Sequence, residues 1–225
     1  MGNTIGEILP PAIGVAISPV PIIAVILMLF TKRPKSISLA FLGGWILGLA
    51  VVSGIVVAVA QPQSFDPDSG PSTAAAIVRL VLGVLLLWLA LRQWRSRPKP
   101  GEEAHIPAWL GALDSFTPAK SLGLGALLSG INPKNLALTL SAAMAIVQGE
   151  LSGAGTAVAI VVFIIIASIS VAAPIAIYLA MGDKASRTLD GWKAWLTANN
   201  HTLTFVLLLV FAVVLLGNGI SGLTD

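Results

Sequence analysis

Four consecutive residues near the middle of an apolar stretch, Asn132, Pro133, Lys134 and Asn135, carry the most specific chemistry in this sequence. A proline inside a membrane-spanning helix interrupts the hydrogen-bond ladder, and the freed backbone groups need partners from protein or from a wet cavity. A lysine at that depth costs about 2.5–3.5 kcal/mol on insertion scales, so such residues usually mark a functional site. We therefore expect a polar site at this position.

Lys134 has no evident fixed partner, because no Asp or Glu lies in the core of any apolar stretch. Its expected company is an anionic headgroup, backbone carbonyls or water. If the helix breaks at Asn132-Pro133, a half-helix begins there and turns its positive end toward an anion. The freed carbonyl lies one turn earlier, near Ser129, and the two asparagine amides suit a sugar or a phosphate. A simple proline kink, or a lysine near an aqueous mouth, is the alternative.

A second interruption is predicted in the first apolar stretch, where Ser18-Pro19-Val20-Pro21 lacks two backbone N–H groups and cannot form a regular helical turn. Ser18 is expected to cap a half-helix that starts at Pro19, and this break is expected to face Asn132. A kinked span packed by its neighbours is the alternative. The predicted substrate-binding residues are Ser18, Pro19, Pro21, Ser129, Asn132, Pro133, Lys134 and Asn135.

The composition indicates the class of protein that must position these residues. Of 225 residues, 56% are hydrophobic and only 10% are charged, against about 25% charged in a typical soluble domain. Apolar runs of about 20 residues without dyad alternation favour an all-α integral membrane protein over a membrane barrel. The net charge of +3 is no nucleic-acid signal, and the lack of cysteine excludes disulfides and thiol chemistry. The two histidines, His105 and His201, have no metal-ligand spacing.

Six transmembrane helices are predicted, at about 5–30, 37–60, 73–92, 119–148, 154–180 and 201–220. They divide the chain into a first three-helix repeat (1–95), a cytoplasmic loop (96–118) and a second three-helix repeat (119–225). Two short segments that mix tryptophan, leucine and charges, 106–116 and 189–196, are predicted to be interfacial helices.

The distribution of basic residues predicts the orientation. Eleven of the 13 lysines and arginines lie in the segments after the first, third and fifth predicted spans, and the loops after the second and fourth spans have none. The positive-inside rule therefore places those basic loops in the cytoplasm and both termini outside a cytoplasmic (inner) membrane. Arg79, early in the third span, is expected to reach the headgroups at the outer face.

An internal similarity relates the first and fourth spans. The segments Gly14–Ser18 and Gly125–Ser129 both have the pattern Gly-x-x-x-Ser, and a proline follows each within a few residues. Because each segment opens a set of three spans, the two halves enter the membrane in opposite directions and form an inverted repeat. A separate Gly-x-x-x-Gly motif, Gly44 to Gly48, allows close helix approach within the bundle, which we favour, or across a homodimer.

The sequence resembles the GAP family, the peptidoglycolipid-addressing or sulfolipid-addressing proteins of actinobacteria, within the lysine exporter superfamily. The first span, LPPAIGVAISPVPIIAVILML, the stretch PAWLGALDSFTPAKSLGLGALLSGINPKNLAL (107–138) and the stretch WKAWLTANNHT (192–202) carry the resemblance. It covers nearly the whole chain, and its NPKN segment is the most specific part. The resemblance implies six spans in two inverted halves and export of a cell-envelope glycolipid.

We therefore expect a transporter that exports an envelope lipid or glycolipid with an anionic headgroup, with no cofactor. A small-solute exporter and an accessory scaffold of an envelope-lipid export machine are the alternatives. The lack of an intramembrane carboxylate counts against a cation-coupled carrier. We expect no enzyme, because the sequence shows no nucleophile–base pair, paired acids or metal cluster.

Overall fold

The computed structural model describes residues 1–59, 73–97 and 116–224, and within these ranges the regular structure is helical throughout. The helices are α1 (Gly2–Ala16), α2 (Pro19–Leu29), α3 (Pro34–Val59), α4 (Thr73–Arg95), α5 (Pro118–Gly130), α6 (Pro133–Gln148), α7 (Gly153–Met181), the 3-10 turn η3 (Gly182–Ala185) and α8 (Ser186–Thr224). The prediction of an all-α protein is confirmed.

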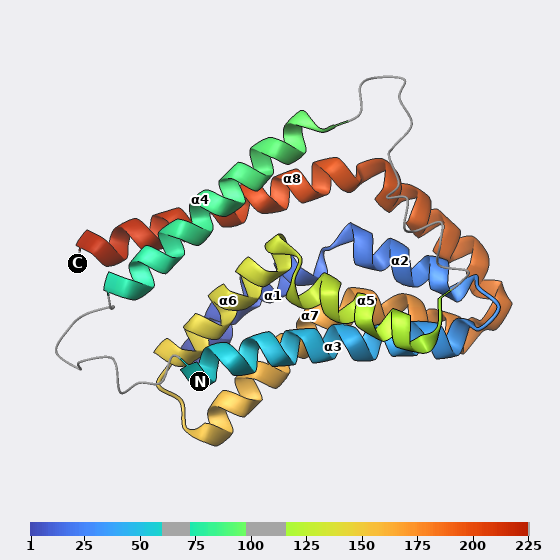
Figure 1. The fold of residues 1–225 in the computed structure, drawn as a ribbon, viewed down its shortest axis with the longest axis horizontal. Coiled ribbons are helices and arrows are strands. Elements are labelled where there is room, and N and C mark those ends of the chain that lie inside the picture. Colours follow the sequence, from blue (N-terminus) through green and yellow to red (C-terminus); the bar gives the residue numbers. More distant parts are fainter. Residues whose placement is uncertain (60–72, 98–115, 225) are drawn as a thin grey trace.

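Several of these helices are long and apolar enough to cross a membrane. Among the described residues, the stretches Pro34–Val59, Ala76–Arg95 and Gly153–Thr224 meet this condition. The bent pair α1–α2 adds a fourth candidate span. Figure 1 shows that the chain reverses direction between α7 and α8, so the third stretch is a helical hairpin. The chain is therefore a multi-pass helical membrane protein.

Both predicted helix breaks are present. The first lies between α1 and α2, whose axes meet at 53°, and α2 starts at Pro19. The second lies between α5 and α6, and α6 starts at Pro133 with Asn132 as its N-cap. In both places proline occupies the first helical position. Its missing N–H costs nothing there, because an N–H at that position has no partner within the helix.

Two boundaries differ from the prediction. The predicted fourth span, 119–148, consists of two short helices of 13 and 16 residues, neither of which reaches the length of about 20 residues that a straight span needs. The segment 189–196 is no separate interfacial helix, because it belongs to the 39-residue α8. No proline or glycine follows it before the predicted sixth span, so nothing ends the helix there. The segment 106–116 falls almost entirely outside the described residues.

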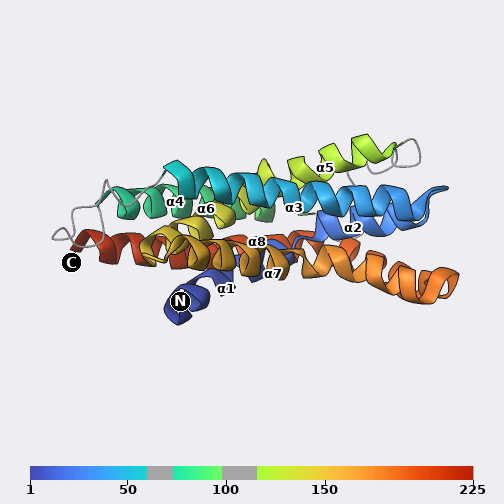
Figure 2. The ribbon, with the colours of Figure 1, turned by 90° about the horizontal axis from the view of Figure 1, so that it is seen from below.

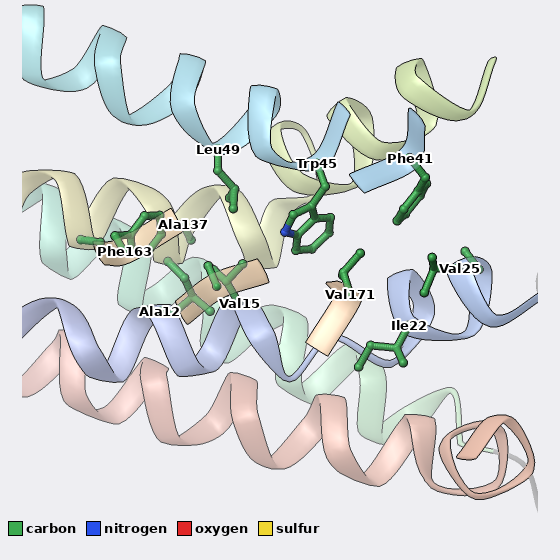
Figure 3. Packing of buried hydrophobic residues seen from close by; sticks show 14 of the residues in the cluster. Ala12, Val15, Ile22, Val25, Phe41, Trp45, Leu49, Ala137, Phe163 and Val171 are labelled. Atoms are coloured by element: carbon green, nitrogen blue, oxygen red, sulfur yellow. The ribbon is translucent and has the colours of Figure 1, made fainter. Parts of the chain in front are cut away.

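The helices form a flat, elongated bundle in which α4 and α8 lie side by side along one edge (Figures 1 and 2). On the other side, α1 packs on α6 and α7, and α3 packs on α5. Figure 3 shows Trp45 of α3 pointing toward Val171 of α7 and Phe41 toward Val25 of α2, whereas Leu49 points toward Val15 of α1. The two helix breaks lie in the middle of the bundle, where α1 and α6 cross (Figure 1).

Close contact between α3 and α5 depends on the Gly-x-x-x-Gly motif. A Cβ atom on Gly44 would lie 1.9 Å from the Leu122 carbonyl oxygen, and one on Gly48 would lie 2.1 Å from Ser129 Oγ. From the opposite helix, a Cβ on Gly125 would lie 2.2 Å from the Phe41 carbonyl oxygen. The motif therefore packs helices within the bundle, as favoured from the sequence, and it holds α5 in place up to the second break.

Candidate functional site

The two helix breaks meet through the side chain of Lys134. This residue lies in the first turn of α6, and its Nζ donates hydrogen bonds to the carbonyl oxygens of Gly14 (2.8 Å) and Ile17 (3.1 Å) and to Ser18 Oγ (2.7 Å). The side chain is 8% exposed. Sequence analysis expected the two breaks to face one another, and they do.

The carbonyls that bind Lys134 belong to the end of α1. The last carbonyls of a helix have no intrahelical partner, and they form the negative end of the helix dipole. A protonated amine placed there satisfies both the hydrogen bonds and the charge. Of the partners expected for Lys134, the structure supplies backbone carbonyls together with a hydroxyl, and these acceptors come from more than 110 residues earlier in the chain.

Ser18 and Asn135 extend this contact across both breaks. Ser18 Oγ lies 2.7 Å from the Val15 carbonyl oxygen and 3.0 Å from Asn135 Oδ1, so its one proton has two alternative acceptors. Asn135 Nδ2 in turn donates to the Leu128 carbonyl oxygen near the end of α5 (2.8 Å). Ser18 was expected to cap α2, but its side chain makes no capping bond and faces the Lys134 network.

The other predicted residues have different surroundings. Ser129 Oγ donates to the Ala126 carbonyl oxygen within its own helix (3.2 Å) and packs on α3. No hydrogen bond joins Ser129 to Lys134. Pro19 and Pro21 are buried in the first turn of α2. Pro133 is exposed, and Asn132 is half-buried with its Oδ1 accepting from the Lys134 backbone N–H (3.1 Å).

A cavity of about 390 Å³ opens beside the second break. It lies between the start of α2, the end of α4, the start of α6 and the middle of α8. Its lining residues are Val20, Leu89, Arg92, Gln93, Ser96, Asn132, Pro133, Lys134, Asn200, Thr204 and Leu208. This lining contains two cations and five neutral hydrogen-bonding side chains and, among the described residues, no carboxylate. The arrangement suits an anionic group attached to a polar body such as a sugar.

The contributions of α4 and α8 to this cavity were not predicted. On α4, Leu89, Arg92 and Gln93 are spaced so that they share one helical face, and Ser96 follows in the turn after the helix. On α8, Asn200 is followed at intervals of four residues by further lining residues. A helical projection of either segment shows a polar stripe, but it does not reveal whether that stripe faces a neighbouring helix, lipid or a cavity.

Interactions around the cavity fix some of its polar groups and leave others unengaged. Gln93 Nε2 and His201 Nδ1 are 3.0 Å apart, so this pair links α4 to α8. The Arg92 guanidinium lies 5.8 Å from the centre of the Trp88 ring, and no hydrogen bond or ion pair is recorded for it within the described residues. These same residues contain no cluster of acids or histidines that could hold a metal ion.

The fold and the site define a multi-pass helical membrane protein in which two interrupted helices meet beside a cationic cavity. Residues 8–221 match the family described as Sap, sulfolipid-1-addressing protein (SfLAP), and the chain belongs to this family. The resemblance stated from the sequence is thereby confirmed over nearly the whole chain. No curated protein matches the chain, and neither does any solved structure.

Proposed function

We propose that this protein exports a cell-envelope glycolipid with an anionic headgroup across the cytoplasmic membrane. The observation that carries the proposal is the cavity at the second break, whose described lining has Arg92 and Lys134 as cations and no carboxylate. Its volume of about 390 Å³ is in the range of small-molecule sites, roughly 300–1,000 Å³. A sugar-sized headgroup therefore fits, whereas acyl chains must remain outside the cavity. The family name, which refers to a sulfolipid, supports a sulfated headgroup.

An inverted repeat is the architecture that we infer for this transport. The helix-pairing pattern supports it: the broken helix α1–α2 packs on α7, and the broken helix α5–α6 packs on α3. The last helices of the two halves, α4 and α8, pack on one another, and the two broken helices meet through α1 and α6. Each half thus offers equivalent surfaces to the other, which is what a pseudo-two-fold axis in the membrane plane produces.

The proposed orientation places both termini outside the cell. The basic turns after α2 and α7 lie at one end of the bundle, and both chain ends lie toward the opposite end (Figure 1). Lys193 Nζ lies 5.5 Å from the centre of the Phe30 ring, which supports the proximity of these two basic regions. The positive-inside rule then makes the basic end cytoplasmic.

A small-solute exporter is the second candidate, and the cavity volume favours it, because a free anionic solute would fit the same space. An accessory role in an envelope-lipid export machine would need the same lipid-binding cavity without independent lipid movement. Neither reading requires a catalytic step, and we propose none.

Reconstitution tests the proposal. The full-length chain is inserted into vesicles that contain a fluorescent sulfated glycolipid or its unsulfated parent, and a membrane-impermeant quencher reports the leaflet of each lipid. We expect faster redistribution of the sulfated lipid than in protein-free vesicles, with a smaller effect on the parent. Transport of soluble sulfated sugars without lipid redistribution would favour the small-solute exporter. Binding without redistribution of either lipid would favour the accessory role.

A further inference from the structure

We propose that Arg92, Asn132 and Asn200 form the donor set that binds the anionic group in the cavity. Lys134 holds the two helix breaks together and gives the ligand no hydrogen bond. The inference rests on the proposed function, because it concerns the same cavity. The group recognised is a tetrahedral oxyanion, a sulfate or phosphate ester.

The hydrogen bonds of Lys134 argue against a direct role in binding. A lysine ammonium has three N–H donors. Its Nζ already has three acceptors within the protein, at 2.7, 2.8 and 3.1 Å. A ligand oxygen could be bound only if one of these bonds broke and left a buried acceptor at the end of α1 without its partner. The charge of Lys134 makes the cavity more positive, but its donors are committed.

Within the part of the chain that the structure describes, Arg92, unlike Lys134, has donors that are free to bind a ligand. Its side chain is exposed, lines the cavity and has no recorded hydrogen bond or ion pair among the described residues. The guanidinium carries five N–H donors in a planar fork that matches two oxygens of a sulfate or phosphate group. Contact with the Trp88 ring at 5.8 Å provides a platform for the side chain without using those donors.

The two asparagines each present an amide nitrogen. Asn132 Oδ1 accepts from the Lys134 backbone N–H, and Asn200 Oδ1 accepts from Thr204 Oγ1 at 3.5 Å. In both residues the oxygen is therefore engaged within the protein, and no partner is recorded for the nitrogen among the described residues. The three donor groups come from α4, the second break and α8, so they surround one cavity from three elements.

Native mass spectrometry of the full-length chain in zwitterionic nanodiscs tests this donor set. The probes are a sulfated galactosyl ceramide and its unsulfated parent, supplied together, and the measured quantity is the ratio in which they bind. We expect Arg92→Gln to lower the preference for the sulfated lipid about tenfold or more, because a charge-assisted pair is lost. Arg95→Gln is the matched control, since Arg95 is exposed on the same helix and does not line the cavity.

A second pair of variants tests the asparagine amides. Asn200→Ala is expected to lower the preference severalfold, whereas Asn199→Ala should leave it unchanged. Asn199 is the adjacent residue, and its Nδ2 already donates to the Trp195 carbonyl oxygen. Lys134→Met is expected to lower the preference for the sulfated lipid less than Arg92→Gln does. This comparison uses only the folded fraction of each variant, isolated by size-exclusion chromatography.

Three outcomes would overturn the assignment. The first is that Arg92→Gln keeps the wild-type preference for the sulfated lipid. The second is that Arg95→Gln loses as much of this preference as Arg92→Gln, and the third is that Lys134→Met loses more of it than Arg92→Gln. Displacement of the bound sulfated lipid by millimolar inorganic sulfate would support the donor set while identifying a free anion as its source. Arg92-dependent binding without lipid redistribution in vesicles would support the donor set and reject the transport proposal. Redistribution of the sulfated lipid that persists in Arg92→Gln would support the transport proposal and reject the donor set.

Discussion

Ser18→Ala tests whether the Lys134 network joins the two helix breaks energetically. The substitution removes one acceptor of the lysine ammonium and one partner of Asn135, and it leaves the charged group buried with two carbonyls. Because the Ser18 side chain makes no capping bond to α2, no loss of helix capping is mixed into the result. The change is also small in volume, so it creates little cavity.

The size of the effect follows from the bonds lost. A hydrogen bond to a charged group contributes about 1.5–3 kcal/mol, against about 0.5–1.5 kcal/mol for a neutral pair. Since Lys134 keeps two acceptors, we expect Ser18→Ala to lower the free energy of unfolding by about 2 kcal/mol. For a chain of this size that corresponds to a decrease in Tm of about 4–8 °C.

Ser129→Ala is the matched control, because Ser129 is equally buried beside the other break and donates only to a carbonyl of its own helix. Its expected cost is about 0.5–1.5 kcal/mol, a decrease in Tm of about 1–6 °C. Unfolding is followed by tryptophan fluorescence in detergent, in the wild-type and in the Lys134→Met background. The cost of Ser18→Ala should shrink by about 1 kcal/mol or more when the ammonium is absent. Equal costs for the two serines, or an unchanged cost of Ser18→Ala in Lys134→Met, would refute the coupling.

Three further outcomes are expected. Gly44→Ala should lower thermal stability clearly, because its Cβ would meet the α5 backbone, whereas Gly43→Ala, with no atom within 4 Å of its Cβ, should not. Asn135→Ala should cost about 1–3 kcal/mol of stability by leaving a carbonyl of α5 unpaired, and native mass spectrometry should find the sulfated-lipid preference unchanged. Since the chain lacks cysteine, Lys184→Cys and Leu223→Cys can each be labelled alone with an impermeant maleimide. Labelling from the cytoplasmic side is expected for the first and from the outside for the second, and the reverse pattern would reject the proposed orientation.

The helix breaks could be predicted from the sequence because their cause is local. Pro19 and Pro133 lack a backbone N–H wherever they lie, and each starts a helix in the structure as its chemistry requires. The limits of α8 were harder to predict, since the charged and tryptophan-rich segment 189–196 differs in polarity from the apolar part that follows but has the same backbone preference. A change in polarity along the sequence indicates where the surroundings change from polar to apolar, and a single helix can extend through both.

Ser18, one of the three partners of Lys134, was among the predicted site residues, but the other two could not be identified from the sequence. They are backbone carbonyls of Gly14 and Ile17, and every residue has a carbonyl, so no residue type marks these two as acceptors. The cavity depends on packing in the same way. Arg92 and Asn200 are separated by more than 100 residues, and only the pairing of α4 with α8 brings both to the second break.

The proposed division between Lys134 and Arg92 also suits the proposed transport. A carrier must bind its cargo strongly enough to collect it and weakly enough to release it. A sulfate ester carries one negative charge, and one guanidinium can neutralise it. If the lysine ammonium also bound the ester directly, the cargo would be held by two cations, and its departure would leave the end of α1 and the ammonium unpaired. Lys134 is bound to helix carbonyls in this structure, and under the proposal it keeps these bonds when cargo binds. The cavity would then stay positive while only the contacts of Arg92 and the asparagine amides form and break.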